Sequence, residues 1–216
     1  MSEFPELMTR DLPPGMRLVA GGVTAAPGFR AGATACGIKS DGAIPDLAML
    51  VADEPCVAVG TFTTSRTPAH PVLLDQQHLA AGNRAQVIAV NSGNANCANG
   101  ERGQRDAQRM AELAAARFGV EPTLALVSST GIIGRPLPIE KVERGIQQIE
   151  VSADGGPDFA SAILTTDTRA KTVAVEFELD GHTARLGGST KGAGMIYPNM
   201  ATMLCYLTSD AAAEAG

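Results

Sequence analysis

A threonine close to the C-terminus follows a sharp turn of the chain. Pro198 fixes its own φ angle and Asn199 tolerates unusual backbone angles, so the next residues can be held in a tight geometry. There the hydroxyl of Thr202 could attack the carbonyl of Ala201. If that bond broke, Thr202 would carry a free α-amine, which titrates near pH ~7.7–8.0 and can activate the hydroxyl as a base. On the residues alone, an ordinary strand over residues 202–207 that begins with a β-branched threonine is the simpler interpretation.

A second group of candidate residues lies in residues 128–134, which read Ser-Ser-Thr-Gly-Ile-Ile-Gly. Acyl transfer through a hydroxyl builds up negative charge on a tetrahedral oxyanion, and a glycine turn can direct a backbone N–H and a hydroxyl at that charge. Thr130 and Gly131 are the candidates for this task. The alternative is a connection from a strand to a helix, in which the serines and the threonine cap the helix.

Two further segments offer groups that could bind a substrate. Residues 164–168 place several hydroxyls and one carboxylate together, which could orient an amino acid or could cap a turn. Lys191 is an isolated lysine beside glycines; such a residue is usually a solvated surface charge, but its cation suits a carboxylate. The order of residues around Lys191 differs from that of a phosphate-binding loop, so we expect no nucleotide site.

Residues 91–100 form a segment with four asparagines and two glycines. Asparagine amides and left-handed backbone positions can line a polar pocket, and they are equally common in a surface turn. Both interpretations remain open on the residues.

The elements that must position these residues follow from hydrophobic periodicity and turn signals. We expect strands over residues 17–20, 33–38, 47–51, 56–63, 86–90, 123–128, 172–179 and 183–186, and helices over residues 71–80, 104–118, 137–149 and 159–164. Asp180-Gly181 joins the last two strands in a hairpin. This order mixes hairpins with a few long helices, which predicts an α+β fold rather than repeating βαβ units.

Composition excludes several classes of function. Seventeen basic and twenty-three acidic side chains give a net charge of −6 without a basic cluster, which argues against nucleic-acid binding. No apolar run approaches membrane-spanning length, and the first residues lack a secretory pattern. Three dispersed histidines and four scattered cysteines predict no metal site. The cysteines have mostly small or apolar neighbours, so we expect buried, reduced thiols and a cytoplasmic protein.

Residues 191–204, which read Lys-Gly-Ala-Gly-Met-Ile-Tyr-Pro-Asn-Met-Ala-Thr-Met-Leu, resemble the self-cleavage segment of the ornithine acetyltransferases (glutamate N-acetyltransferases) of arginine biosynthesis. The Ser-Thr-Gly, Thr-Thr-Asp and Asn-Ser-Gly-Asn-Ala-Asn segments also resemble motifs of that family and occur in its order. The resemblance spans the chain from about Gly21 onward and favours the pocket interpretation of residues 91–100.

The resemblance implies cleavage between Ala201 and Thr202, with Thr202 as the nucleophile. It implies that Thr130 and Gly131 form the oxyanion hole, and that Thr165, Lys191 and Thr202 bind substrate. It leaves Thr166 and Asp167 without a role. The implied reaction moves an acetyl group from N2-acetylornithine to glutamate through an acetyl-threonine, without a cofactor, and some members also use acetyl-CoA. The implied fold is a layered α/β/β/α sandwich that assembles as α2β2 or a higher multiple.

Precursors of this family are about twice as long as the present chain. Residues 1–201 therefore resemble the α chain and residues 202–216 the start of the β chain, and we expect the 216-residue chain alone to be inactive. Two alternatives remain open. One is a self-processed hydrolase or aminopeptidase that uses the same threonine. The other is a non-catalytic chain that binds an amino acid or a partner subunit, marked by an unpaired sheet edge or a large apolar patch.

Overall fold

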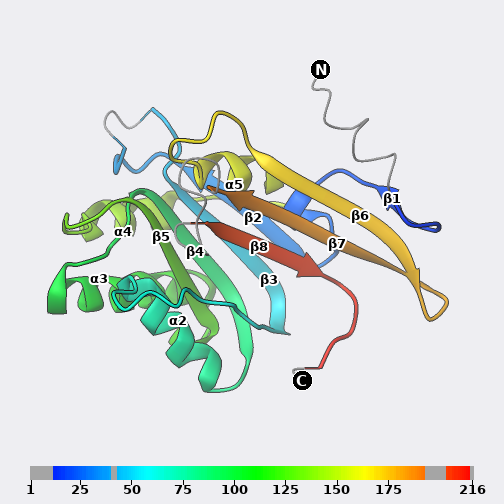
Figure 1. Cartoon of the computed structure of the whole chain (residues 1–216), viewed down its shortest axis with the longest axis horizontal. Coiled ribbons are helices and arrows are strands. Elements are labelled where there is room, and N and C mark those ends of the chain that lie inside the picture. The colour runs from blue at the N-terminus through cyan, green and yellow to red at the C-terminus, as the bar shows by residue number, and fades with distance from the viewer. Residues whose placement is uncertain (1–11, 40–42, 193–202, 215–216) are drawn as a thin grey trace.

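The computed structural model describes residues 12–39, 43–192 and 203–214, which form two four-stranded sheets with helices between and beside them (Figure 1). The first sheet has the order β2-β3-β4-β5 and the second the order β1-β6-β7-β8. Neighbouring strands are antiparallel, except β4 and β5, which are parallel and are connected through a helix. The chain is thus a mixed α/β structure with two sheets.

The elements have the following bounds. The strands are β1 (Arg17–Leu18), β2 (Phe29–Thr34), β3 (Leu47–Val57), β4 (Arg84–Asn94), β5 (Ala125–Ile132), β6 (Lys171–Leu179), β7 (His182–Lys191) and β8 (Leu204–Ser209). The helices are α2 (His70–Ala80), α3 (Gly100–Phe118), α4 (Ile139–Gln148) and α5 (Gly156–Ala162), with short 3-10 turns at η1 (Gly22–Thr24) and η2 (Pro122–Leu124).

One hydrophobic core lies between the first sheet and the helices α3 and α4. Alternate residues of a strand point to one face, so Met49 and Val87 face the helices together. Met110 of α3 and Ile146 of α4 pack against them, and all four side chains are almost fully buried. The helical spacing of their apolar residues therefore places α3 and α4 on this face of the sheet.

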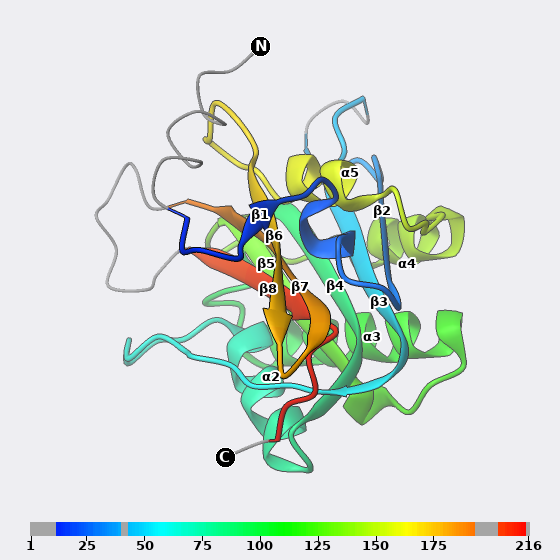
Figure 2. The same cartoon turned by 90° about the vertical axis from the view of Figure 1, so that its right-hand side faces the viewer.

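A second core covers the opposite face of the first sheet. Leu50 and Val90 pack there against Phe159 of α5 and Tyr206 of β8. The rings of Phe159 and Tyr206 meet edge to face, with centroids 5.2 Å apart. Both faces of the first sheet are therefore covered, and the second sheet reaches it on the side opposite α3 and α4 (Figure 2).

Several expected elements are confirmed, and three of the expected strands differ from the structure. The four helices and the hairpin at Asp180-Gly181 are present, with ends shifted by up to a few residues. The two strands expected over residues 47–51 and 56–63 are one strand, β3, because a bulge between Val51 and Cys56 absorbs the polar stretch between them. Residues 58–69 are not a strand.

The strand expected over residues 33–38 instead ends at Thr34. Buried Asp46 accepts hydrogen bonds from the backbone N–H groups of Cys36 (2.7 Å) and Lys39 (2.8 Å), so these groups bind a side chain rather than a neighbouring strand. The cysteines are free thiols as expected, but the prediction that they are buried was wrong: Cys205 is exposed, and Cys36 and the other two are half-buried.

Candidate active site

Three of the predicted site residues meet at the end of β7. The ammonium group of Lys191 donates hydrogen bonds to the Thr130 hydroxyl at 2.9 Å and to the Thr165 hydroxyl at 2.8 Å. Lys191 ends β7, Thr130 lies near the end of β5, and Thr165 follows α5. The structure therefore brings together residues that lie far apart in the sequence.

Lys191 is buried, with 3% of its surface exposed. Ser189 and Lys191 lie on the same face of β7 because they are two residues apart in a strand, and both are buried. A lysine beside glycines is usually solvated, so this burial was not predictable from the residue types alone. A buried ammonium group needs polar partners, and the two threonine hydroxyls supply them.

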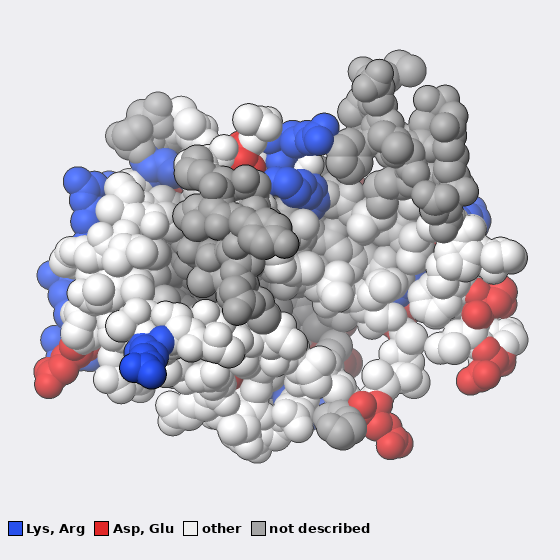
Figure 3. All heavy atoms as spheres, in the orientation of Figure 1, with Lys and Arg blue, Asp and Glu red and all other residues white. Residues whose placement is uncertain are grey.

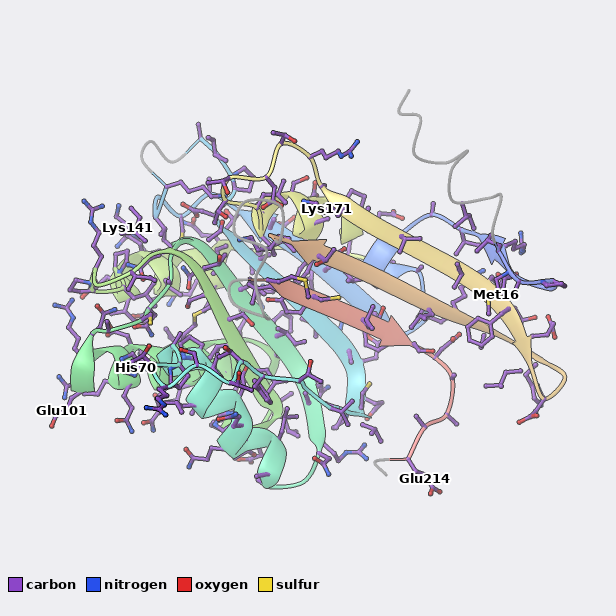
Figure 4. All side chains as sticks on the ribbon, in the orientation of Figure 1. Met16, His70, Glu101, Lys141, Lys171 and Glu214 are labelled. Carbon is purple, nitrogen blue, oxygen red and sulfur yellow. The ribbon has the colours of Figure 1, made fainter. Side chains whose placement is uncertain are left out.

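The charge on Lys191 is set by several groups. Burial lowers its pKa below the ordinary value, and the nearby Lys171 lowers it further, whereas the carboxylate of Asp167 opposes both effects. Figure 4 shows Lys171 at the start of β6, where this strand pairs with the end of β7. Lys39 also lies within electrostatic range of Lys191, and burial lowers the pKa of Lys39 as well. The site is therefore a basic region in which Asp167 offsets the charge beside Lys191 and Asp46 offsets the charge of Lys39.

Gly131 has a backbone that only glycine fits. Its φ angle is +136°, and it pairs with Gly93 across the parallel strands β4 and β5. A Cβ atom at Gly131 would lie 2.3 Å from the carbonyl carbon of Gly93 and 2.6 Å from the nitrogen of Asn94. The close approach of the two strands holds the backbone of Gly131 next to the hydroxyl of Thr130. The motif at residues 128–132 is part of β5 rather than a cap of the following helix.

The asparagine-rich segment, residues 91–100, is neither a surface turn nor a pocket lined by its buried asparagines. Residues 91–94 belong to β4, and Asn91, Asn94 and Asn96 are buried. The Asn94 amide donates to the carbonyls of Arg135 (3.1 Å) and Pro136, and the Asn96 amide donates to a backbone carbonyl of α3. The Asn91 amide donates to the carbonyl of Asn94. All three amides therefore bind backbone carbonyls of the chain, so the pocket prediction is not supported for these three side chains.

Asp167 contacts the same region, although neither its residue type nor the motif resemblance assigned it a role. Its carboxylate accepts the backbone N–H of Gly192 at 2.9 Å and the ammonium group of Lys171. Its sequence signals are its place as the third residue of the Thr-Thr-Asp segment and its four-residue spacing from Lys171.

Two of the predicted residues, Ala201 and Thr202, lie outside the described residues. Within the described parts of the chain, no group of three or more histidine, cysteine, aspartate or glutamate side chains could hold a metal ion. No helix there has the length and apolarity needed to cross a membrane.

Comparison with known proteins gives consistent matches. The model of the ArgJ family matches residues 30–216. The chain is 46% identical over 196 residues to the arginine biosynthesis bifunctional protein ArgJ of Thermosynechococcus vestitus, a match that covers 90% of this chain and 46% of that protein. It is 50% identical over 184 residues to the protein of the same name from Thermus thermophilus, covering 85% of this chain and 47% of the relative. The chain therefore spans about half the length of the curated relatives it matches.

Two solved structures have the same fold. The arginine biosynthesis bifunctional protein ArgJ of Bacillus halodurans matches with a TM-score of 0.81 and 34% identity, covering 88% of this chain and 98% of the solved chain. The ornithine acetyltransferase of Mycobacterium tuberculosis, complexed with ornithine, matches with a TM-score of 0.77 and 36% identity, covering 88% of this chain and 100% of the solved chain. On the extent of the family match and these identities, the chain belongs to the ArgJ family.

Proposed function

We propose that this chain supplies the N-terminal half of an acetyltransferase of arginine biosynthesis, which moves the acetyl group of N2-acetylornithine to glutamate through an acetyl-threonine at Thr202. The observation that carries the proposal is the buried Lys191, bound to the hydroxyls of Thr130 and Thr165. These are three of the residues to which the sequence motifs assign oxyanion and substrate roles. The relatives' names and the ornithine bound to one solved relative support the substrate class.

The proposed chemistry has two steps. The hydroxyl of Thr202 attacks the acetyl carbonyl of N2-acetylornithine, and the α-amine of Thr202 takes the hydroxyl proton. The carbon–nitrogen bond then breaks, the proton passes to the leaving amine, and ornithine departs. The amine of glutamate then attacks the carbonyl of the acetyl-threonine ester, and the bond between the acetyl carbon and the threonine oxygen breaks. The glutamate amine gives up a proton, which passes through the α-amine of Thr202 to the threonine oxygen, and N-acetylglutamate departs. In both steps Thr130 and Gly131 stabilise the oxyanion.

The contacts of Lys191 suit Thr130 to this role. A hydroxyl has one proton to donate and two lone pairs that accept. Lys191 donates to the Thr130 oxygen, so the Thr130 proton remains available for an oxyanion. Gly131, held against β4, places its backbone beside that hydroxyl. In the same proposal Lys191 and Thr165 position the substrate, for which a cation and a hydroxyl are suitable partners.

The proposal includes cleavage of a longer precursor between Ala201 and Thr202. The match covers nearly the whole of the solved chains but only about half of the curated relatives, which supports a precursor divided near its middle. The second half would complete the layered sandwich and assemble with this half as α2β2 or a higher multiple. The protein would act in the cytoplasm without a cofactor, with acetyl-CoA as a possible second acetyl donor.

Intact mass tests the nucleophile directly. We expect a version of the chain extended to the length of its relatives to be cleaved between Ala201 and Thr202, and the Thr202→Ala variant to remain whole and inactive. A Thr202→Ser variant, which keeps a hydroxyl, should retain cleavage. Cleavage that is unaffected in Thr202→Ala would refute the assignment.

Glutamate distinguishes the transferase from a hydrolase that uses the same threonine. In a transferase, glutamate accelerates the release of ornithine from N2-acetylornithine because it removes the acetyl group from the enzyme. In a hydrolase, water does so, and the rate of ornithine release is independent of glutamate. The release rate at increasing glutamate concentrations is therefore the deciding measurement.

A further inference from the structure

The Asp167 carboxylate contacts both the residue that follows β7, Gly192, and the first residue of β6, Lys171. Its side chain is 5% exposed, although it lies in the segment between α5 and β6. One oxygen, Oδ1, accepts the N–H of Gly192 at 2.9 Å and contacts the ammonium group of Lys171. The other oxygen, Oδ2, is buried and has no hydrogen-bond partner among the described residues.

The first of these contacts fixes the point at which the chain leaves β7. Gly192 directly follows Lys191, and its φ angle of +85° turns the chain out of the strand. Thr202 lies ten positions further along the sequence. Asp167 therefore holds the start of the segment that leads to the proposed cleavage point.

The second contribution of Asp167 is its charge. The charged groups that face Lys191 are Asp167 from the segment after α5, Lys171 from β6 and Lys39 from the segment after β2. Asp167 is the acid among them. Burial raises the pKa of Asp167, but the hydrogen bonds from Lys171 and Gly192, together with the charges of Lys171 and Lys191, outweigh burial and hold this pKa below its usual range. The carboxylate is thus ionised at neutral pH.

We propose that Asp167 is a positioning residue of the active site, which fixes the exit of β7 at Gly192 and supplies the negative charge beside Lys191, whose ammonium group binds Thr130 and Thr165. The inference rests on the proposed acyl transfer at Thr202. An ordinary surface ion pair would not explain the same observations. Lys171 is 38% exposed, and a partly exposed ion pair contributes little to stability by itself. It would require neither the burial of the Asp167 carboxylate nor its hydrogen bond from the Gly192 N–H next to Lys191.

Two substitutions in the full-length precursor separate the hydrogen bond to Gly192 from the negative charge beside Lys191. Asp167→Asn keeps an oxygen that can accept the Gly192 N–H but removes the charge. We expect it to cleave itself and to show an alkaline limb of the kcat/KM profile at lower pH than in the wild type, because Lys191 then loses its proton more easily. Asp167→Ala removes both functions and should slow self-cleavage roughly tenfold or more, as expected for the loss of a charge-assisted bond.

Asp210→Asn is the matched control. The Asp210 carboxylate also accepts a backbone N–H of β7, that of Arg185 at 2.7 Å, but at the other end of the strand from Lys191. We expect this variant to leave both self-cleavage and the alkaline limb unchanged. If Asp167→Asn and Asp167→Ala behave like Asp210→Asn, the proposal is overturned.

Direct titration of Lys191 separates this inference from the proposed function. NMR of lysine side chains labelled with 13C reports the Lys191 pKa without any turnover. A lower Lys191 pKa in Asp167→Asn than in the wild type supports the inference even if Thr202→Ala disproves the nucleophile. An unchanged Lys191 pKa refutes it even if Thr202 is the nucleophile.

Discussion

The buried ammonium group of Lys191 orients the hydroxyls of Thr130 and Thr165, and this determines which hydrogen bonds each hydroxyl can still make. A lysine ammonium donates and never accepts, so both Thr130 and Thr165 must accept from it. Each hydroxyl proton then points elsewhere and can serve a ligand. At the scale of single residues, the site is therefore a set of donors arranged around a fixed cation, which suits substrates with negative or developing negative charge.

Gly131→Ala should lower the stability and the self-cleavage of the protein far more than Gly134→Ala does. The new Cβ would lie 2.3 Å from the backbone of Gly93, so β4 and β5 would have to separate beside Thr130. A side chain at positive φ adds a cost of about 1–3 kcal/mol. We expect a lower free energy of unfolding in urea and loss of self-cleavage by intact mass.

Gly134→Ala is the control for that substitution. Gly134 also has a positive φ, +77°, but a Cβ there would meet no atom within 4 Å. It should cost only the strain of the backbone angle, about 1–2 kcal/mol, and should leave self-cleavage intact. Equal losses in the two variants would show that the contact between Gly131 and β4 is unimportant.

At the scale of elements, α2 takes the place of a missing neighbour for β5. β5 is an edge strand of the first sheet, and an edge leaves backbone groups without a partner strand. The Asp75 carboxylate accepts the N–H of Val127 at 2.8 Å, and the His78 ring contacts the carbonyl of Ala125 at the same distance. Asp75 and His78 lie one turn apart on α2. The helix therefore provides hydrogen-bond partners for two backbone groups, the N–H of Val127 and the carbonyl of Ala125, on the free edge of the strand that carries Thr130.

Asp75 should make the stability of the chain depend on pH. Burial raises its pKa to about 8, although the bond from Val127 opposes the change, so the folded state keeps a proton that the unfolded state releases at a pH near 4. Between these values the folded state binds more protons, and the free energy of unfolding therefore falls as the pH rises, by at most about 1.4 kcal/mol per pH unit.

Asp75→Asn tests this dependence. Asparagine keeps the acceptor for Val127 and cannot ionise, so the variant should lack the contribution of Asp75. Urea unfolding at a pH of about 5 and of about 7 should show a smaller decrease for the variant than for the wild type. The same decrease in both proteins would show that Asp75 does not carry a raised pKa.

The elements that the sequence predicted best are those set by local patterns. α3 has a regular apolar stripe and ends at Gly119, whose positive φ is a common helix end, and the Asp180-Gly181 turn determines its hairpin. The errors arise where contacts between residues far apart in the sequence determine the end or the course of a strand. Asp46 ends β2 from across the turn, and the bulge in β3 depends on pairing with β4. Among the candidate site residues, motif resemblance predicted Thr130, Thr165 and Lys191, which the structure brings together, but the contacts of Asp167 depend on tertiary structure.

At the scale of the whole molecule, the outer face of the second sheet is apolar and exposed. Val173 of β6 and Leu207 of β8 flank Gly188 of β7 across the sheet, and Leu186 lies nearby; all three apolar side chains are exposed. Figure 3 shows few charged side chains over β7 and β8 on the described surface. Large exposed apolar faces usually mark an interaction surface. The chain spans about half of its relatives' length, and under the proposed function the remaining half would cover this face.

Leu207→Lys should therefore affect the assembled protein and the isolated chain in opposite ways. Leu207 is 68% exposed on β8, the edge strand of this sheet, and a lysine there would have to be buried against the rest of the precursor. We expect the variant to remain more soluble than the wild type as the 216-residue chain, but to bind the separately produced remainder of the precursor, which starts after residue 216, more weakly, as measured by size-exclusion chromatography with light scattering. Leu73→Lys, a change at a half-exposed leucine on α2, is the control and should not weaken the binding. If Leu207→Lys binds as tightly as Leu73→Lys, the second half covers a different surface, and the apolar face must be assigned another partner.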